Sequence, residues 1–318
     1  MENIAFGPVP SRRLGKSIGI NNIPPKICSY ACIYCQLGRA IYMDDQRKTH
    51  YQPDEIISSV KNKLSQARQN NEPVDYLTFV PDGEPTLDEN LCQEIRRLKD
   101  TESKLAVITN SSLLHDQKVR KALQQTDLVS VKIDAVDEPI WKKINRPHKN
   151  IKLAAVLDGL KTFSKEFQGK LITETMLING INDTKECLED TAQFISLLHP
   201  HATYISIPTR PPAKKSVKPA KEEKVNMAYQ IFSEYTSHVE YLIGYEGNAF
   251  AHSGNTEKDI LGITAVHPMR EDAVQEFLEK DGADSSLIDK LVKNGRLLET
   301  KFNGKKFYVR KFSEKQQM

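Results

Sequence analysis

The sequence lacks long apolar runs, an export signal and a strong net charge. No window of the 318 residues approaches the roughly 18 consecutive apolar residues of a membrane span, so no membrane association is expected. The N-terminus, Met1–Pro8, has no basic region followed by an apolar core, so we expect a protein that stays in the cytoplasm. The formal net charge of +3 is close to neutral for this length, and it gives no case by itself for binding nucleic acid.

Cysteine is scarce, and three of the five cysteines lie close together. Five cysteines are an odd and sparse set for a chain of 318 residues, which argues against a disulfide framework. Cys92 and Cys187 lie in helical patterns, where a free cysteine usually behaves as a small buried apolar residue. Cys28, Cys32 and Cys35 can instead converge on one metal centre if the chain loops around it. Thiolate ligands favour iron–sulfur clusters, zinc or copper(I).

The cysteine spacing alone leaves zinc and an iron–sulfur cluster open. A zinc site needs a fourth ligand, for which His50 is the nearest candidate on the C-terminal side, and there is no second Cys-x2-Cys pair. The Cys-x3-Cys-x2-Cys run, with Tyr34 directly before its last cysteine, resembles the signature of the radical SAM superfamily. The resemblance implies a [4Fe-4S] cluster whose fourth iron binds the amino and carboxylate groups of S-adenosylmethionine (SAM). It also implies that Tyr34 lies against the adenine.

Short β-branched runs alternate with longer amphipathic segments between residues 75 and 208. The apolar runs are Tyr76–Val80, Leu105–Ile108, Leu128–Val131, Leu171–Ile178 and Tyr204–Ile207. The amphipathic segments are Asp54–Gln69, Glu89–Lys99, Lys118–Gln125, Asn150–Phe163 and Lys185–Leu198. With an earlier strand at Ser17–Asn21 and a final one at Val239–Gly244, this alternation predicts an α/β fold with a parallel sheet and crossover helices. The pattern leaves a doubly wound sheet open, while the resemblance implies a partial (βα)6 barrel of TIM type.

Polar loops follow the predicted strands, where parallel barrels carry their catalytic groups. Gly83, Glu84 and Pro85 follow the second strand and match the last three residues of the superfamily's Gly-Gly-Glu-Pro motif. The resemblance implies that these residues contact the amino group of SAM. Asp82 stands in place of the first glycine of that motif. Asn182, in the loop after the fifth strand, is expected at the ribose by the same resemblance.

Three polar residues, Ser130, Lys132 and Asp134, alternate with apolar residues along the fourth predicted strand. Period-two alternation puts their side chains on one face, which lines the interior of a barrel. A buried lysine needs an anionic neighbour, so Lys132 is expected to bind an anionic ligand or to pair with a carboxylate such as Glu174. The resemblance implies that Ser130 and Lys132 belong to the cofactor site, with Lys132 at the SAM carboxylate. Lys132 and Glu174 are the predicted catalytic pair.

A basic loop, Arg210–Lys221, follows the sixth predicted strand and is pinned by prolines. Such a loop would overhang the mouth of a barrel active site. A cluster of one sign at that place attracts anionic substrates, phosphates included. Lysine-rich loops are also ordinarily just solvated, so the sequence leaves both interpretations open.

The pattern changes after the predicted barrel. Met269–Lys280 and Ser285–Lys293 predict two helices, and Asn303–Gly304 predicts the turn of a hairpin. Helix, helix and hairpin resemble a winged helix-turn-helix, so residues 257–312 are expected to form a small winged-helix-like domain and 313–318 a frayed tail. The basic hairpin fits contact with an RNA or DNA backbone, and it equally fits a docking domain whose lysines are solubilising.

The segments Phe6–Gly19 and Cys28–Gly38 together resemble one branch of the superfamily, commonly described as similar to the wyosine-forming, tRNA-modifying radical SAM synthases. The likeness runs over about residues 5–250, so we expect 1–250 to be the barrel. The wyosine enzymes need a second cluster bound by N-terminal cysteines. This chain has no cysteine before Cys28, so their two-carbon condensation is not expected here.

The predicted function is a radical SAM enzyme that reductively cleaves SAM at a [4Fe-4S] cluster and makes a 5′-deoxyadenosyl radical for hydrogen abstraction. RNA is one competing substrate class, and a protein residue or a glycyl-radical enzyme is the other. The implied partner is a one-electron reductant of the flavodoxin or ferredoxin type. A redox-sensing winged-helix DNA-binding regulator is an alternative of a different class, against which a SAM site argues.

Overall fold

The computed structural model describes residues 4–38, 40–243, 250, 255–266 and 268–311. The strands are β1 (Ala5–Ser11), β2 (Gly15–Ile20), β3 (Ile27–Cys28), β4 (Tyr42–Met43), β5 (Tyr76–Phe79), β6 (Lys104–Thr109), β7 (Leu128–Lys132), β8 (Lys170–Met176), β9 (Ala202–Ser206), β10 (Val239–Leu242), β11 (Met269–Arg270), β12 (Leu297–Phe302) and β13 (Lys305–Arg310). The helices are α1 (Pro53–Gln69), η1 (Pro85–Leu87), α2 (Leu91–Leu98), η2 (Lys99–Thr101), α3 (Gln117–Leu123), α4 (Glu138–Asn145), α5 (Leu153–Glu166), α6 (Lys185–Ser196), α7 (Glu222–Tyr235), α8 (Thr256–Val266), α9 (Glu271–Asp281) and α10 (Ser286–Lys293).

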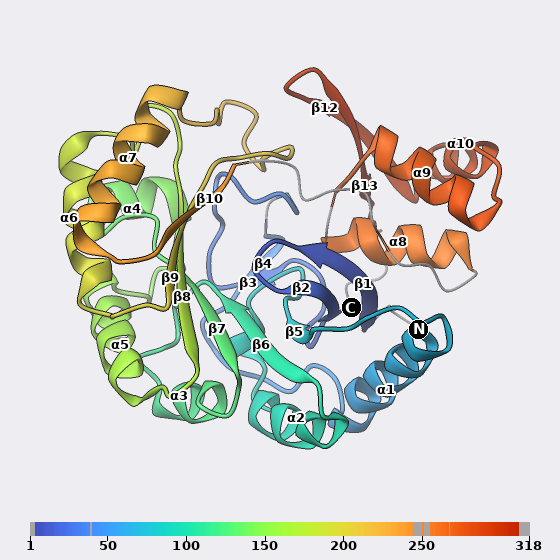
Figure 1. Cartoon of the computed structure of the whole chain (residues 1–318), viewed down its shortest axis with the longest axis horizontal. Coiled ribbons are helices and arrows are strands. Elements are labelled where there is room, and N and C mark those ends of the chain that lie inside the picture. The colour runs from blue at the N-terminus through green and yellow to red at the C-terminus, as the bar shows by residue number, and fades with distance from the viewer. Residues whose placement is uncertain (1–3, 39, 244–249, 251–254, 267, 312–318) are drawn as a thin grey trace.

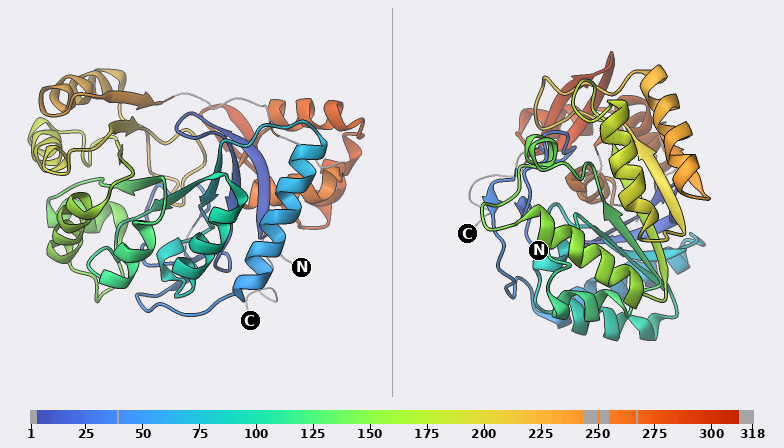
Figure 2. Two further views of the ribbon diagram at one scale, coloured as in Figure 1. Left: turned by 60° about the horizontal axis from the view of Figure 1, so that its bottom comes forward. Right: turned by 90° about the vertical axis from the view of Figure 1, so that its left-hand side faces the viewer.

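The largest sheet of the described residues has eight strands in the order β1-β2-β5-β6-β7-β8-β9-β10. Every neighbouring pair from β2 to β10 is parallel, and β1 runs antiparallel to β2. Figures 1 and 2 show that the sheet curls and that the crossover helices lie on its outer side. A doubly wound sheet would reverse its strand order, so the predicted partial TIM-type barrel is confirmed and that alternative is wrong.

Helix α1 illustrates why the helices cover the outside of the sheet. Its apolar residues Ile56, Val60 and Leu64 recur at helical spacing, and all three are buried. They belong to the same core cluster as Ile18 of β2 and Leu77 of β5, so one face of the helix packs on the sheet. Across the part of the chain that the structure describes, no helix has the length and apolar character that a membrane crossing requires.

The C-terminal part consists of α8, α9, α10 and a small sheet in the order β11-β13-β12. The two predicted helices and the hairpin that turns at Asn303–Gly304 are present. The predicted helix start at Met269 is wrong, because Met269–Arg270 pairs with β13 and the helix begins at Glu271. Helix α8 was not predicted. A winged-helix identity for this part stays a prediction, and the expected tail 313–318 lies outside the described residues.

Helix α8 packs against β1, the edge strand of the barrel sheet. Phe6 of β1 and Ala265 of α8 share a buried cluster, and Lys63 of α1 pairs with Asp259 of α8 at 3.3 Å. The ring of Phe6 occupies the place of a side chain at Gly19, where an added Cβ would lie 2.0 Å from the ring. The C-terminal part therefore covers the antiparallel edge of the barrel (Figure 1).

Candidate active site

Cys28, Cys32 and Cys35 line one cavity of about 340 Å³. Cys28 lies in β3, and the other two follow in a turn in which the Cys35 backbone N–H donates to the Cys32 carbonyl at 3.1 Å. The cavity is also lined by the carboxyl ends of parallel strands, among them Thr109 of β6 and Ser206 of β9. The structure thus brings the cysteine loop and the strand ends together, as a barrel active site requires.

Two amide side chains donate to the cysteine sulfurs. Asn110 Nδ2 lies 3.6 Å from Cys28 Sγ, and Asn145 Nδ2 lies 3.5 Å from Cys32 Sγ. Burial raises the pKa of all three cluster-motif thiols, that of Cys32 to about 12. These thiols therefore need nearby positive charge to ionise, and metal ions supply it because a coordinating thiol is deprotonated.

His50, the fourth ligand that a zinc site would need, is not grouped with the cysteines. Burial lowers the pKa of its imidazole, and the charged side chains that act on it are Lys48, Asp44 and Glu89. Within the described ranges, no three His, Cys, Asp or Glu side chains are arranged around a single metal ion. Three sulfurs on one cavity wall suit a [4Fe-4S] cluster with one iron left open better than a structural zinc ion, which takes four protein ligands.

Gly83 brings the loop after β5 against the cysteine loop. It forms a short parallel bridge with Ile27, and the Glu84 backbone N–H donates to the Ile27 carbonyl at 3.2 Å. A Cβ on Gly83 would lie 1.9 Å from that carbonyl oxygen, so only glycine permits this approach. Pro85 begins η1 and is buried behind the loop.

Replacing Gly83 by alanine is expected to lower the iron content and to destabilise the protein by about 1–3 kcal/mol, because the methyl group forces the two loops apart. Iron and sulfide analysis after anaerobic reconstitution and the urea midpoint measure the two effects. Gly180→Ala is the control for backbone strain without a clash, since its φ is +69° but nothing lies within 4 Å of a Cβ added there, so it should lower the urea midpoint slightly and leave the iron content unchanged. Wild-type iron content and midpoint in Gly83→Ala would contradict the need for this close approach.

The carboxylate of Glu84 accepts four hydrogen bonds from the protein. The donors are the Thr86 backbone N–H at 3.1 Å and hydroxyl at 2.6 Å, the Thr109 hydroxyl at 2.6 Å, and the Asn110 backbone N–H at 2.7 Å. Burial raises the pKa of Glu84, and these donors oppose the rise. Glu84 therefore ties the loop after β5 to the loop after β6, which carries Asn110 to Cys28.

Asp82 replaces a glycine of the superfamily motif, and Lys26 balances the charge of its carboxylate. The two side chains form a largely buried ion pair at 3.1 Å, and the Lys26 backbone N–H donates to the Asp82 carbonyl at 2.7 Å. Burial raises the pKa of Asp82 to about 6, while Lys26 opposes the rise. The pair adds a second link between the loop after β5 and the cysteine loop. The charge of Asp82 raises the pKa of the Cys35 thiol, and the charge of Lys26 lowers it.

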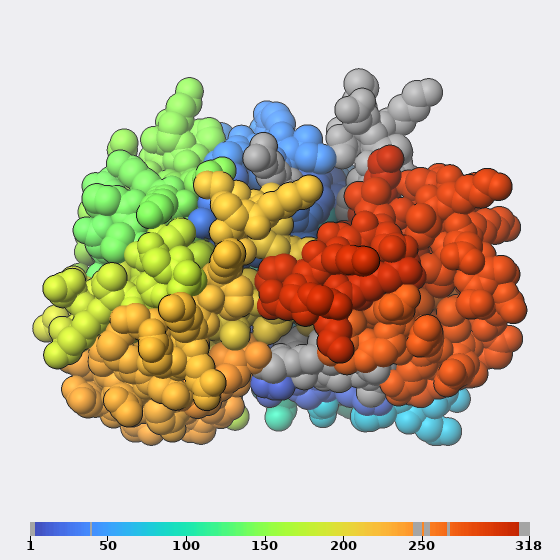
Figure 3. All heavy atoms as spheres, turned by 90° about the horizontal axis from the view of Figure 1, so that it is seen from above, coloured from blue at the N-terminus to red at the C-terminus, as the bar shows by residue number. Residues whose placement is uncertain are grey.

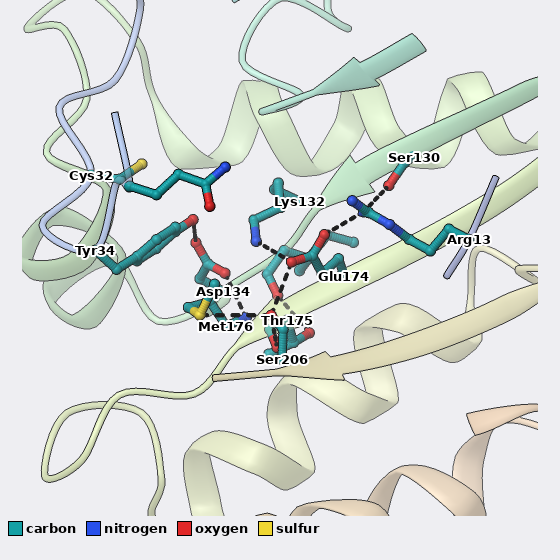
Figure 4. A network of polar contacts seen from close by, with 12 residues as sticks. Arg13, Cys32, Tyr34, Ser130, Lys132, Asp134, Glu174, Thr175, Met176 and Ser206 are labelled. Atoms are coloured by element: carbon teal, nitrogen blue, oxygen red, sulfur yellow. Dashed lines mark hydrogen bonds and ion pairs between the residues drawn. The ribbon is translucent and has the colours of Figure 1, made fainter. Parts of the chain in front are cut away.

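Lys132, Glu174 and Arg13 form a buried charge cluster on the cavity wall (Figure 4). Glu174 Oε1 lies 2.9 Å from Lys132 Nζ, and Oε2 lies 2.5 Å from Arg13 Nη1. Ser206 donates to Glu174 at 2.9 Å, and Arg13 donates to Ser130 at 3.2 Å. Burial would raise the pKa of Glu174, but the two cations outweigh burial and lower it to about 2. The ion pair expected between Lys132 and Glu174 is therefore present.

Arg13 is the site residue that sequence reasoning missed. It lies in the turn between β1 and β2, yet it reaches Glu174 of β8, which is 161 residues away in the chain. Its Nε is buried and has no hydrogen-bond partner in the described part of the protein. The Arg12–Arg13 pair was visible in the sequence, but a turn before the first parallel strand gave no sign that its side chain faces the interior.

Tyr34 connects the cysteine loop to the end of β7. Its hydroxyl donates to Asp134 at 2.5 Å, and Lys132 Nζ lies 5.1 Å from the centre of its ring. Asn145 also donates to Asp134, at 2.6 Å, so this carboxylate supports two residues around Cys32. The predicted contact between Tyr34 and an adenine stays a prediction, and the ring does line the cavity.

Asn182 is not among the described residues that line the cavity, and it is 1% exposed. Its Nδ2 donates to the carbonyls of Asp134 at 2.8 Å and Met176 at 2.9 Å, and its Oδ1 accepts from the Ile178 backbone N–H at 2.9 Å. These bonds hold the turn after β8. The ribose contact predicted for Asn182 stays a prediction that this geometry does not favour.

Residues 22–195, more than half of the chain, match the radical SAM superfamily. A UPF0026 protein of Methanocaldococcus jannaschii is 47% identical over 309 residues, which cover 96% of each chain. The chain is a UPF0026 member of the radical SAM superfamily. GTPase Obg of Brachyspira hyodysenteriae is 35% identical over 305 residues, and this radical SAM chain spans 44% of the length of that relative. The solved structure of TYW1 with a lysine-pyruvate adduct has a TM-score of 0.54 at 17% identity, covers 70% of this chain and 74% of that one, and shows a shared fold.

Membership in the superfamily confirms the predicted enzyme class and cofactors. A radical SAM enzyme uses a [4Fe-4S] cluster and SAM, and it needs a reductant. The donor set of this chain fits the cluster, because three thiols share one cavity and two amides donate to their sulfurs. The fit extends to Gly83, whose missing side chain leaves room for the cysteine loop. Which residues hold each cofactor stays a prediction.

Proposed function

We propose that this radical SAM enzyme abstracts hydrogen from an RNA substrate that enters the cavity beside the loop after β9. Three residues of that loop, Pro208, Thr209 and Arg210, line the cavity. Arg210 donates to Gln36 at 2.8 Å, which fixes the loop beside the cysteine motif. The loop continues into the basic segment 214–221, and Figure 3 shows this amber segment on the same face as the red C-terminal hairpin.

Unpaired positive charge in the segment 214–221 is the observation that carries this proposal. Its side chains Val217 and Ala220 are buried, and the Lys214 backbone N–H donates to the Ile33 carbonyl at 3.0 Å, so the segment is anchored. Four exposed lysines have no acidic partner among the described residues: Lys214, Lys215, Lys218 and Lys221. A fixed row of lysines at the mouth of a cavity attracts a phosphate backbone.

The cysteines and the two asparagine amides are assigned to the cluster. Cys28, Cys32 and Cys35 would hold the irons, with Asn110 and Asn145 orienting two of the sulfurs. When bound and reduced, the cluster would supply the one electron that cleaves the carbon–sulfur bond of SAM into methionine and a 5′-deoxyadenosyl radical for hydrogen abstraction. The protein would hold the reacting groups in position.

The charged wall of the cavity is assigned to the SAM carboxylate. Lys132 and Arg13 both line the cavity and share the carboxylate of Glu174, and Asp134 is a further anion that acts on Lys132. An anionic group in the cavity would lie beside both cations, and the unpartnered Nε of Arg13 offers a further donor. Glu84 would act indirectly, by holding rigid the loop whose backbone meets the SAM amino group.

The C-terminal hairpin is proposed as a second RNA contact, within a winged-helix-like domain. Lys301 and Lys305 are exposed near its turn. Lys306 contributes less, because it pairs with Glu271 at 3.2 Å and Glu299 at 3.0 Å. The hairpin is therefore less basic than its sequence suggests, and the segment 214–221 carries the larger free charge.

Transfer RNA is expected to bind the cluster-loaded protein with a steep salt dependence. Replacing Lys214, Lys215 and Lys218 together by glutamine should flatten the log–log salt slope by about 2 and weaken binding by more than about tenfold at low salt. Filter binding over a salt series gives both numbers, and 5′-deoxyadenosine release with and without RNA tests turnover.

The matched control removes three exposed lysines elsewhere, by the substitutions Lys61→Gln, Lys118→Gln and Lys170→Gln. This control variant should keep the wild-type slope. SAM cleavage stimulated by a peptide mixture but not by RNA would overturn the proposal in favour of a protein substrate.

A further inference from the structure

Two large apolar side chains are exposed on the outer side of the cysteine loop. Ile41 is 59% exposed and Tyr42 is 56% exposed, although such residues are usually buried. Tyr42 begins β4, which pairs with β3, so that Met43 lies opposite Cys28. The Asp44 backbone N–H also donates to the Cys28 carbonyl at 3.2 Å. The exposed patch is therefore joined directly to a cluster cysteine.

A strap of chain, residues 145–149, continues this surface. The Ala31 backbone N–H, between two of the cysteines, donates to the Arg146 carbonyl at 3.1 Å. Asn145 is buried, and its side chain reaches Cys32 Sγ at 3.5 Å, while the next residue, Arg146, is exposed. Asn145 is therefore the residue of this strap that separates Cys32 from solvent.

The rim of this surface is positively charged. Lys143, Arg146 and Lys149 are exposed and have no acidic partner within the described ranges. The neighbouring carboxylate of Asp45 is mostly buried and lies 3.4 Å from the imidazole of His148, which links the strap to the loop after β4. Three free cations thus lie on or beside the strap, which adjoins the loop that carries the exposed Ile41 and Tyr42.

We propose that Ile41 and Tyr42, with the rim of Lys143, Arg146 and Lys149, dock an acidic one-electron carrier protein. The inference rests on the proposed radical chemistry in one respect, because the cluster must receive an electron from outside. The carrier is oxidised by one electron and the cluster is reduced by one, while no covalent bond forms or breaks. Electron transfer weakens steeply with distance, so the electron enters where cluster ligands lie closest to the surface.

Charge complementarity and accessibility select this face for the carrier. The opposite side of the cysteine loop faces the cavity, which SAM and the substrate would fill. A carrier on the outer side therefore does not compete with either of them. An apolar centre with a charged rim also suits a transient redox complex, which buries little area and depends on charge for its association rate.

Reversing the rim charges tests the proposal without any RNA. In the cluster-loaded variant Lys143→Glu, Arg146→Glu, Lys149→Glu, reduction by flavodoxin hydroquinone at low salt should slow by more than about tenfold, because electrostatic steering is lost. Stopped-flow bleaching of cluster absorbance gives that rate, and calorimetry with oxidised flavodoxin should show a matching loss of affinity. Reduction by dithionite, which needs no docking, should keep its wild-type rate and also shows that the variant is folded and loaded.

The matched control carries the same charge change on the substrate side, by the substitutions Lys214→Glu, Lys215→Glu and Lys218→Glu. This control should keep the wild-type affinity for flavodoxin and the wild-type rate of reduction. Wild-type flavodoxin kinetics in the rim variant, or an equal loss in the control, would overturn the docking assignment. Because RNA is absent from these measurements, failure of the RNA proposal would leave their outcome unchanged.

Discussion

The variant Cys32→Ala is expected to form no detectable 5′-deoxyadenosine from SAM under reducing, anaerobic conditions. Cys32 supplies one of three thiols on the cavity wall, and Asn145 is placed 3.5 Å from its sulfur. Loss of a metal ligand should exceed the roughly 10–100-fold loss that follows removal of an outer hydrogen-bond partner. Mass spectrometry of the product, together with iron analysis, measures the effect.

Cys92→Ala is the control for the loss of a thiol. Cys92 lies in α2, where its sulfur accepts a hydrogen bond from Gln125 Nε2 at 3.0 Å, and it does not line the cavity as described. It should keep full iron content and SAM cleavage. A Cys32→Ala protein that still cleaves SAM at the wild-type rate would remove the cysteine loop from the mechanism.

Glu174→Gln is expected to destabilise the cluster-loaded protein by about 3–5 kcal/mol at neutral pH, because it leaves two buried cations without their carboxylate. Arg13 and Lys132 both contact Glu174, and both side chains are largely buried on the cavity wall. The urea midpoint under anaerobic conditions measures the change. The same variant should bind SAM more weakly, since Glu174 holds Lys132 in place.

The difference in stability between wild type and Glu174→Gln should depend on pH, because the pKa of Glu174 is lowered in the folded protein. A carboxyl with a pKa of about 2 in the folded protein and 4.5 unfolded stabilises fully above pH 4.5 and loses its effect as the pH falls toward 2. The gap between wild type and Glu174→Gln should shrink over that window. Glu166→Gln is the control, because Glu166 forms a partly exposed pair with Arg120 and should cost less than about 1 kcal/mol. Equal midpoints for Glu174→Gln and wild type would contradict the buried charge cluster.

Short-range patterns predicted most of the barrel. The run Tyr76–Val80 became β5 and Asp54–Gln69 became α1, because β-branched runs and helical spacing act within a few residues. Helix α4 was missed, since its eight residues between longer runs gave a weak periodic signal. Its start could have been found, because Asp137 caps it by accepting from the Ile140 backbone N–H at 2.9 Å.

In the candidate site too, local features could be predicted from the sequence and long-range contacts could not. The cysteine spacing and the Gly83–Pro85 motif were visible in the sequence, because each acts within a single loop. The partners that support them were not, since Asn145 meets Cys32 across 113 residues and Arg13 meets Glu174 across 161. Such contacts depend on the curvature of the whole sheet. Local spacing carries no information on that curvature.

The contact between Arg13 and Glu174 also bears on when the site forms during synthesis on the ribosome. Arg13 is synthesised 161 residues before its carboxylate, and Ser206, which completes the wall, follows Glu174 by 32 more. Contacts that span so much chain form late, because the loop between them must first be closed. The cysteine loop is therefore synthesised long before the strands that complete the cavity. A maturation machinery that delivers iron and sulfide during synthesis would meet three exposed thiols, whereas after β9 has joined the sheet it would meet thiols that line the cavity.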